Sequence, residues 1–418
     1  MNRMADTPIF KQNLASLKKV DEVKGVVLYK DGKYIDTIPN AEGKRGSLTL
    51  YANALGFEDG TLGKKEAEQI LTWFGEYKDI AQQNPGAHPN VDRLIPVING
   101  EQTLRAVVDF NIPADLEGRV LRFDDIKKQG KLKDEKEKAL ETFNEVMDLL
   151  EKGHLRTAQY GEGGWKVNNW VKKGIMLGFP LGNVVVYNGS HDVQFTDKET
   201  FPLRKIGSDA GFRVVPPASG LRRGSYAGKG CTFMPPAYVN VGAFVGQNTM
   251  VENLAGSCSQ TGKNCHISAG SIIGGVLDPI EATPVIIGDY CLLGEGSGVT
   301  QGTRLGDIVT LAPGVHISKA TPVIDPIKGI AYTSKGIVSL EKIRLEGSAN
   351  RILTFYDLGD RVMQEKDSSY GPEIPSGALV IPGMSVSSRG DLKVTPMIAK
   401  YISKPEERAY ALEEALRK

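Results

Sequence analysis

Residues 287 to 317 read IGDYCLLGEGSGVTQGTRLGDIVTLAPGVHI and carry an aliphatic side chain at every sixth position. These positions are Ile287, Leu293, Val299, Leu305, Leu311 and Ile317. A six-residue period fits neither the helical period of 3.6 nor the alternation of a flat strand. It is typical of a left-handed parallel β-helix, a three-sided coil in which each hexad supplies one side and points its aliphatic residue inward. Small residues four positions later allow tight corners.

The same period continues on both sides of this stretch, with interruptions. The further positions are Val239, Val245, Val251, Ile267 and Ile273 upstream, and Ile374, Val380 and Val386 downstream. The spacing of sixteen between Val251 and Ile267 is not a multiple of six and predicts one shortened side. Residues 274–284 are expected to form a loop outside the coil, and residues 319–373 a longer excursion. We therefore expect the β-helix over residues 213–390 and a C-terminal tail over residues 391–418.

The N-terminal part of the chain has mixed α/β character. Residues 26–38 form two β-rich runs around Asp31-Gly32, which predicts a hairpin. Residues 64–79 have the apolar spacing of an amphipathic helix. A charged stretch after residue 125 suggests a domain boundary there, so we expect an α/β domain over residues 1–125 and a helical α/β domain over residues 126–212.

The charge balance argues against partners whose binding requires a large net charge on the protein. Lys and Arg total 51 and Asp and Glu total 50, so the formal charge is +1, which disfavours nucleic-acid or anionic-membrane binding. The sequence has neither a signal peptide nor an apolar run long enough to span a bilayer, so we expect a cytoplasmic protein. The four cysteines form no C-x-x-C pair and are interpreted as small buried fillers.

Three functions are considered for such a prism: CoA-dependent acyl transfer, metal-dependent hydration, and a pure scaffold. A metal site would need clustered histidines, and of the five in the chain only His266 and His316 lie on the predicted prism. We therefore expect no metal. Either histidine could act as a general base, or form ordinary surface hydrogen bonds.

Two long segments carry a specific resemblance. Residues 211–252, GFRVVPPASGLRRGSYAGKGCTFMPPAYVNVGAFVGQNTMVE, and residues 256–287, GSCSQTGKNCHISAGSIIGGVLDPIEATPVII, closely resemble the tetrahydrodipicolinate N-succinyltransferases of bacterial lysine biosynthesis. The similarity extends into residues 149–179, which look like that family's N-terminal domain, and into residues 374–383. Residues 1–125 lie outside it, as does the excursion, and no role is assigned to either.

The resemblance implies a reaction and an assembly. The family joins succinyl-CoA to the amine of 2-amino-6-oxopimelate, the open form of tetrahydrodipicolinate, and releases CoA. It implies a homotrimer with sites between adjacent prisms, succinyl-CoA as co-substrate and no further cofactor. Two alternatives remain. One is a related acyltransferase that uses acetyl-CoA or another amino-acid acceptor, as in the tabtoxin pathway. The other is a non-catalytic scaffold that displays the N-terminal domain.

The resemblance also implies roles for individual residues. Glu252 follows inward Val251 and should point outward, as the acid/base or as a nucleophile that forms a transient acyl anhydride. Arg213 matches the arginine that holds a substrate carboxylate. Arg222 and Arg223 could hold the second carboxylate, or be an exposed basic pair.

The CoA arm is expected to lie against small residues of the coil. The candidates are Ser268, Ala269, Gly270, Gly294, Gly296 and Ser297, whose other explanation is corner formation. Lys400, with Lys393 and Lys404, could meet the CoA phosphates. Many family members have a second acidic residue where this chain has Gly298, and Glu295 is a possible substitute.

Overall fold

The protein is described by a computed structural model that covers residues 9–188, 194–347, 351–365, 370–386 and 392–407. It has two compact units, residues 1–113 with 159–166, and residues 114–158 with 167–418. The division therefore falls after residue 113 and not at the expected residue 125. The physical reason is helix α7 (Leu116–Lys128), which buries Val120 and Phe123 and packs with the helices of the second unit.

The first unit is an antiparallel sheet covered by helices. The sheet order is β2-β1-β4-β3, with β1 (Val23–Lys30), β2 (Lys33–Pro39), β3 (Gly60–Leu62) and β4 (Leu104–Phe110). The helices are α1 (Ile9–Ser16), α2 (Arg45–Ala54), α3 (Lys64–Phe74), α4 (Tyr77–Gln83), α5 (Pro89–Asp92) and α6 (Leu94–Ile98). The predicted hairpin is confirmed, since Asp31 and Gly32 link β1 to β2 with φ of 50° and 78°. The expected helix over 64–79 is broken at Gly75, whose φ is 55°.

A second hairpin completes this unit. It consists of β5 (Ala158–Gly161) and β6 (Gly164–Val167). Tyr160 packs edge-on against Tyr29, with ring centroids 5.5 Å apart, and the Gly163 N–H donates to the Gly32 carbonyl at 2.9 Å. The N-terminal sheet thus gains part of its contacts from residues about 130 positions further along the chain, counted from Tyr29 to Tyr160.

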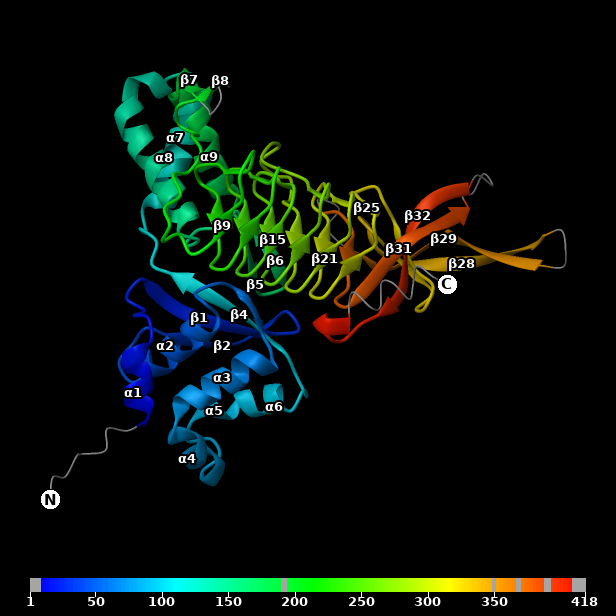
Figure 1. Cartoon of the computed structure of the whole chain (residues 1–418), viewed down its shortest axis with the longest axis horizontal. Coiled ribbons are helices and arrows are strands. Elements are labelled where there is room, and N and C mark those ends of the chain that lie inside the picture. The colour runs from blue at the N-terminus through cyan, green and yellow to red at the C-terminus, as the bar shows by residue number, and fades with distance from the viewer. Residues whose placement is uncertain (1–8, 189–193, 348–350, 366–369, 387–391, 408–418) are drawn as a thin grey trace. The chain divides into compact units, whose positions relative to one another are not determined.

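Three helices begin the second unit. Helix α7 packs with α8 (Lys136–Glu151) and α9 (Asn169–Leu181), joined by the short turn η1 (Leu132–Glu135) and followed by the hairpin of β7 (Val184–Asn188) and β8 (Gln194–Lys198) (Figure 1). Within the described ranges, no helix has the combined length and apolar character that crossing a bilayer requires.

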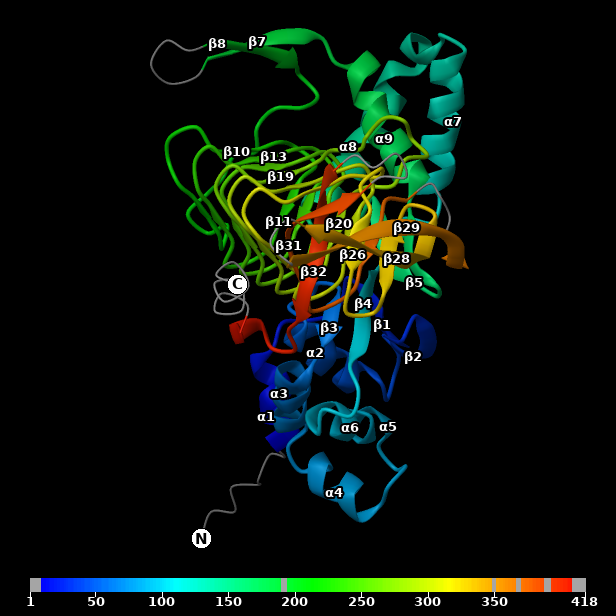
Figure 2. The same cartoon turned by 90° about the vertical axis from the view of Figure 1, so that its right-hand side faces the viewer.

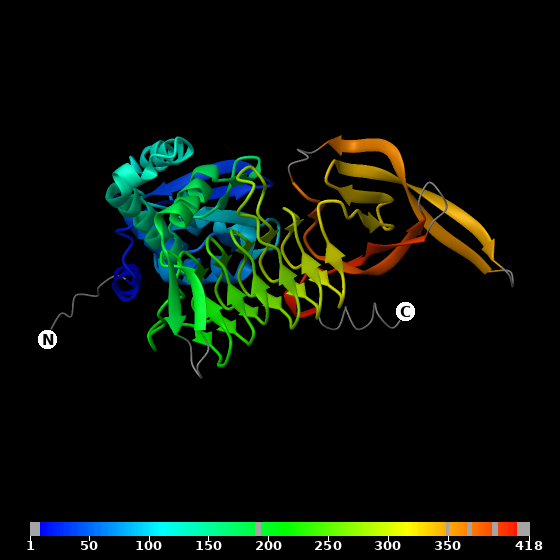
Figure 3. The same ribbon diagram turned by 90° about the horizontal axis from the view of Figure 1, so that it is seen from above.

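The rest of this unit is a three-sided parallel prism, in which each short strand up to residue 299 pairs with the strand three positions later (Figures 2 and 3). Side 1 contains β9 (Arg213–Val214), β12 (Thr232–Phe233), β15 (Met250–Val251), β18 (His266–Ile267), β21 (Leu292–Leu293), β24 (Thr310–Leu311) and β31 (Ala378–Val386). Side 2 contains β10 (Gly220–Leu221), β13 (Tyr238–Val239), β16 (Leu254–Ala255), β19 (Ile272–Ile273), β22 (Gly298–Val299) and β25 (His316–Ile317). Side 3 contains β11 (Tyr226–Ala227), β14 (Phe244–Val245), β17 (Gln260–Thr261), β20 (Ile286–Ile287), β23 (Arg304–Leu305) and β30 (Glu373–Ile374). The parallel β-helix expected from the hexads is confirmed.

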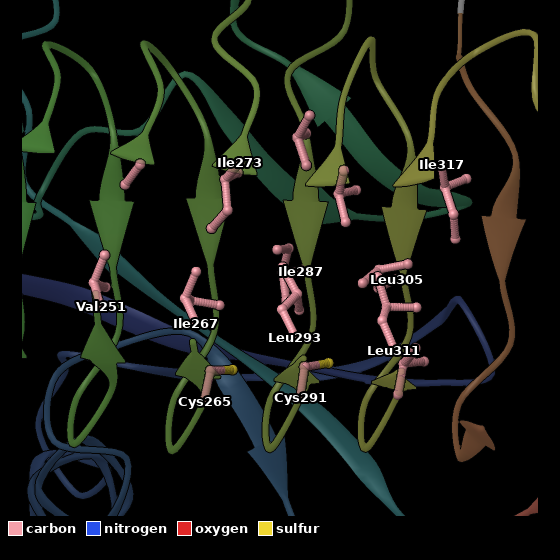
Figure 4. Packing of buried hydrophobic residues seen from close by; sticks show 14 of the residues in the cluster. Val251, Cys265, Ile267, Ile273, Ile287, Cys291, Leu293, Leu305, Leu311 and Ile317 are labelled. Carbon is pink, nitrogen blue, oxygen red and sulfur yellow. The ribbon is translucent and has the colours of Figure 1, made fainter. Parts of the chain in front are cut away.

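The inward residues of these strands form one continuous core. Figure 4 shows the aliphatic side chains of successive coils inside the prism, with Cys265 and Cys291 side by side in neighbouring coils. All four cysteines are buried, as predicted. The thiols of Cys265 and Cys291 lie 3.1 Å from the Gly288 and Gly306 carbonyls, so they act as weak donors within the coil.

Both interruptions of the period are found where the sequence places them. Two residues, Glu252 and Asn253, separate β15 from β16, whereas four residues separate β18 from β19. The predicted loop lies between Ile273 and Ile286, the last and first residues of the flanking strands. The shortened side is therefore a shortened corner, and it lies directly at Glu252.

The excursion is a set of strands that joins side 1 rather than a loose loop. Its strands are β26 (Val323–Asp325), β27 (Ile330–Thr333), β28 (Gly336–Gly347) and β29 (Arg351–Glu365), and β32 (Leu392–Tyr401) joins them to β31. Val323, Tyr332 and Ile398 belong to the core cluster of the prism. These strands therefore shield the last coils from water, as terminal caps do in repeat proteins.

Two expectations about the C-terminal part are wrong. The coil does not continue to Val386, because β31 leaves the prism after Val380 and pairs antiparallel with β32. The described part of the expected tail is not separate, since Leu392–Tyr401 is a strand of the side 1 sheet, whereas residues 391 and 408–418 lie outside the described residues. A short turn, η2 (Pro405–Glu407), follows it.

One inward position is polar and gives a stability prediction. Thr261 is fully buried in register with Val245 and Ile287, and within the described structure its hydroxyl has no hydrogen-bond partner. We expect Thr261→Val to raise the free energy of unfolding by about 1 kcal/mol, because an unpaired buried hydroxyl is removed. Thr249→Val is the matched control and should be destabilising, since the Thr249 hydroxyl donates to the Gly262 carbonyl at 2.9 Å and accepts from the Cys265 N–H at 3.1 Å. Urea unfolding of both variants measures the difference.

Candidate functional site

The candidate residues gather on one edge of the prism, where each coil turns from side 1 to side 2. Successive turns on this edge are residues 234–237, 252–253, 268–271, 294–297 and 312–315. Backbone hydrogen bonds stack them, for example from the Gly314 N–H to the Glu295 carbonyl at 2.9 Å. The structure therefore brings predicted base Glu252 and every predicted CoA-binding residue except Lys400 onto a single line, which we call the catalytic edge.

Glu252 lies at the shortened turn of this edge. Its N–H donates to the Ile267 carbonyl at 2.9 Å, which fixes the backbone, and its side chain is 24% exposed. The carboxylate Oε1 lies 3.7 Å from Nε2 of His266, the outward residue of the next side 1 strand. That nitrogen is buried and has no hydrogen-bond partner within the described residues. A carboxylate and an imidazole thus face each other at the position expected for the base.

The second candidate histidine occupies another place. His316 is on side 2, paired with Gly298 of the preceding strand. A Cβ at position 298 would lie 2.4 Å from His316 Nδ1, so the imidazole fills the space that a side chain there would need. Gly298, where many family members carry an acidic residue, therefore leaves the space that the His316 imidazole occupies. Of the two histidines, His266 is the one that the structure places beside Glu252.

Small residues line the catalytic edge in the coils that follow Glu252. Gly270 and Gly296 have φ of 70° and 63°, the left-handed conformation that glycine adopts without strain. The Ser271 hydroxyl donates to the Gly294 carbonyl at 2.8 Å and so points inward. The left-handed backbone at these corners explains why both residues are glycine. No atom lies within 4 Å of a Cβ built at Gly296, so the surface beside Gly296 is open. Glu295 is exposed on the same edge, two side 1 strands beyond Glu252.

Arg213 lies on the same side of the prism as Glu252. It is the outward residue of β9, two strands before β15, which corresponds to about 10 Å along side 1. Its side chain is exposed and has no ion-pair partner among the residues that the structure describes. A diacid that reaches Glu252 could extend along side 1 towards this guanidinium.

Arg222 and Arg223 lie on a different edge, between sides 2 and 3, and have internal partners. Arg222 pairs with Asp197, and its guanidinium lies 4.9 Å from the Phe201 ring. Arg223 lies 3.7 Å from the Asp148 carboxylate. The structure does not bring either arginine to Glu252. Both side chains instead tie the first coils of the prism to the preceding domain.

The C-terminal lysines are distant from Glu252. Lys400 is half-buried on β32, opposite Leu379. Between β15 and β32 there are five strand spacings along side 1, or about 24 Å. Lys393 and Lys404 are exposed. Their expected contact with CoA phosphates stays a prediction.

Family comparisons match three parts of the chain. Residues 10–108 match the family described as "Uncharacterized protein conserved in bacteria (DUF2322)". Residues 122–181 match the tetrahydrodipicolinate N-succinyltransferase N-terminal family, and residues 284–319 match the hexapeptide repeat of succinyl-transferase. The N-terminal unit thus has its own family, separate from that of the prism.

Curated relatives align with slightly less than half of the chain. A 2,3,4,5-tetrahydropyridine-2,6-dicarboxylate N-succinyltransferase of Polynucleobacter asymbioticus is 44% identical over 190 residues, which are 44% of this chain and 68% of the relative. Relatives of the same name from Methylorubrum extorquens and Xylella fastidiosa are 40% and 41% identical, and the alignments cover 46% of this chain and 70% and 71% of those proteins.

Proposed function

The chain belongs to the tetrahydrodipicolinate N-succinyltransferase family, and from this premise we propose that it transfers the succinyl group of succinyl-CoA to the amine of 2-amino-6-oxopimelate. This reaction is a step of lysine and diaminopimelate biosynthesis. The observation that carries the proposal is the catalytic edge, on which the outward carboxylate of Glu252 and a smooth row of small residues lie together. We assign the prism the left-handed sense of the hexapeptide-repeat acyltransferases.

In the proposed reaction, Glu252 removes a proton from the substrate nitrogen. An amine attacks a thioester carbonyl only as the free base, so a proton acceptor must lie within hydrogen-bond reach. The new C–N bond forms while the carbonyl π electrons move onto oxygen. The tetrahedral intermediate then expels the CoA thiolate, which takes up a proton, and the amide product remains. His266, 3.7 Å from Glu252, is placed to share that proton.

A covalent route through the same residue is the alternative mechanism. The Glu252 carboxylate would attack the thioester, release CoA and form an acyl anhydride that the amine then opens. The two routes differ before the acceptor arrives. A burst of free thiol with succinyl-CoA alone, stoichiometric with enzyme, would support the anhydride.

Arg213 is proposed to bind one carboxylate of the acceptor. We expect Arg213→Ala to raise the KM for the acceptor by about 10-fold or more, because a hydrogen bond to a charged group is lost. The KM for succinyl-CoA should change little. Lys205→Ala, which removes another exposed cation, is the control. Equal effects on both KM values would contradict the assignment.

The assembly and the co-substrate belong to the same proposal. We propose a homotrimer in the cytoplasm, in which the catalytic edge faces a neighbouring prism, with succinyl-CoA as co-substrate and no metal or further cofactor. Light scattering on the purified full chain measures the subunit number. A monomer with full activity would contradict a site shared between prisms.

Thiol release tests the function itself. The purified chain should release CoA from succinyl-CoA when tetrahydrodipicolinate is added, and acetyl-CoA should be a poorer donor. Faster release with acetyl-CoA would indicate a related acyltransferase of different donor preference. No release with any CoA thioester would favour the non-catalytic scaffold.

A further inference from the structure

Backbone amides form a regular ladder along the catalytic edge. In turns 294–297 and 312–315, the third residue donates its N–H to the carbonyl of the second residue of the turn before it. The Gly296 N–H donates to the Ala269 carbonyl at 3.0 Å, and the Gly314 N–H to the Glu295 carbonyl at 2.9 Å. Each such amide therefore has an acceptor in the preceding coil.

This ladder is interrupted at Gly270. The preceding turn has only Glu252 and Asn253, so the residue that would offer a carbonyl to the Gly270 N–H is missing. The Asn253 carbonyl accepts from the Tyr238 N–H at 3.0 Å, just as the Ser297 carbonyl accepts from the Ile272 N–H at 2.9 Å. Asn253 thus corresponds to the last residue of a regular turn, and the two middle residues are absent.

The missing residues leave a gap in the edge, which we call the notch. It lies between turn 234–237 and turn 268–271, with Glu252 and Asn253 at its base. Within the described part of the chain, the Gly270 N–H has no hydrogen-bond acceptor. By the geometry of the ladder, this N–H is directed towards the preceding coil, which places it on the side of the notch opposite turn 234–237. Gly270 is exposed, so water can satisfy this N–H in the free enzyme and a ligand can take the place of that water.

We propose that the Gly270 N–H is the donor that stabilises the oxyanion during acyl transfer. The inference rests on the proposed function, because it needs a thioester carbonyl at the notch. The carboxylate of Glu252 belongs to the adjacent coil, one strand spacing or about 4.8 Å from the turn that carries Gly270. A thioester carbonyl in the notch can therefore have a proton acceptor on one side and an amide donor on the other.

The step balances without any further reactant. The substrate nitrogen forms a bond to the thioester carbon, and the π electron pair moves to the oxygen that the Gly270 N–H contacts. The nitrogen proton passes to Glu252. When the carbonyl re-forms, the C–S bond breaks and the thiolate leaves with its electron pair. Donors that are fixed before charge develops lower such a barrier because they need no reorganisation.

Replacing one backbone N–H by oxygen tests the donor directly. Glycolic acid, incorporated at position 270 by translation with a suppressor tRNA, turns the amide into an ester and changes no side chain. We expect kcat to fall by about 10²-fold or more, the usual effect of losing one oxyanion donor. The unfolding midpoint should fall only slightly, because no hydrogen-bond donor used within the protein is removed and the bond from the Gly296 N–H to the Ala269 carbonyl, now an ester, is only weakened.

The same replacement at Gly314 is the matched control. That N–H is on the same edge and donates to Glu295, so its loss should lower the unfolding midpoint while kcat stays near wild type. A Gly270 ester with kcat within about threefold of wild type overturns the proposal. If Glu252→Gln is inactive in that case, the proposed function still stands. A wild-type chain that releases no thiol removes both.

An insertion provides a second test with ordinary amino acids. Ala-Gly inserted between Glu252 and Asn253 restores a four-residue turn and supplies a carbonyl to the Gly270 N–H. We expect a folded protein with strongly reduced kcat, although Glu252 is retained. Ala-Gly inserted after Gly86, in the exposed turn between α4 and α5, controls for insertion as such. Full activity of the regularised coil would contradict a role for the notch.

Discussion

Glu252→Gln should lower kcat by about 10²-fold or more and leave the fold intact, because the variant keeps the shape of the side chain but cannot accept a proton. The side chain is partly exposed on the prism surface and its backbone N–H bonds to Ile267, which the substitution preserves. Free thiol release with succinyl-CoA and tetrahydrodipicolinate measures the effect. Circular dichroism and light scattering check folding and subunit number.

Two further carboxylates make this test specific. Glu295→Gln removes the other acid of the catalytic edge, two strands away, and should reduce kcat far less. Glu373→Gln removes a carboxylate of side 3, which lies 3.6 Å from Arg304, and is the control for charge alone. A Glu252→Gln protein with full turnover, or a larger loss at Glu295, would show that the base is misassigned.

The contact between Glu252 and His266 provides a second test of the proposed proton transfer. If the imidazole shares the transferred proton, His266→Gln should change the pH profile of kcat while the KM for the acceptor stays similar. A purely structural histidine would alter stability and leave the shape of the pH profile unchanged. The comparison separates a proton carrier from a packing residue.

The expected β-helix includes the first coils, although their inward residues do not show the aliphatic period clearly. These inward residues are Leu221, Ala227 and Phe233. Leu221 follows Val214 by seven positions, and alanine and phenylalanine differ too much in size to stand out as a repeat. The prediction that the coil continues to Val386 was wrong for another reason. Six is a multiple of two, so in an ordinary strand positions 380 and 386 also lie on the same face.

The domain boundary was placed too late because charge alone marked it. The charged residues after position 125 lie on the last turn of α7, on η1 and on the first turn of α8, and both helices bury their opposite faces. The candidate site was predicted as a list of residues from the family resemblance, and the hexad pattern added that Glu252, which follows an inward aliphatic position, points outward. Its pairing with His266 was not predicted, because that contact depends on which coil lies next to the shortened turn.

Arg222 shows the converse limit of sequence analysis. A basic pair beside a loop fits substrate binding and structural pairing equally well, and only the fold reveals Asp197 and Phe201 as its neighbours.

The absence of a backbone acceptor for the Gly270 N–H, in contrast, could have been inferred from the spacing of the aliphatic residues. Once the shortened turn is placed directly after Val251, the missing carbonyl follows from the hydrogen-bond ladder of the regular turns.

Lys172→Met should destabilise the second unit by about 3 kcal/mol or more, because three partly buried hydrogen bonds from a charged donor are lost. Lys172 is on α9 and is fully buried. Its Nζ donates to the carbonyls of Pro279, Ile280 and Ala282 at 3.1, 2.8 and 2.8 Å. One ammonium therefore holds the loop that interrupts the prism between β19 and β20.

The neighbouring lysine is a matched control for this variant. Lys173 is on the same helix, 28% exposed, and its ammonium lies 4.0 Å from Asp124. A partly exposed pair of this kind contributes about 0–1 kcal/mol, so Lys173→Met should be nearly neutral. Urea unfolding of both variants gives the difference. Equal stability of the two would show that the loop does not depend on the buried ammonium.

The pH dependence of stability tests the same contact independently. Burial lowers the pKa of Lys172 below that of an unfolded lysine. Between these two pKa values the unfolded chain binds more protons than the folded one, so the wild-type free energy of unfolding should rise with pH there. Lys172→Met should lack this rise, whereas Lys173→Met should keep it. An identical slope in all three proteins would mean that the hydrogen bonds to the three carbonyls offset the desolvation of the ammonium, so that burial does not lower its pKa.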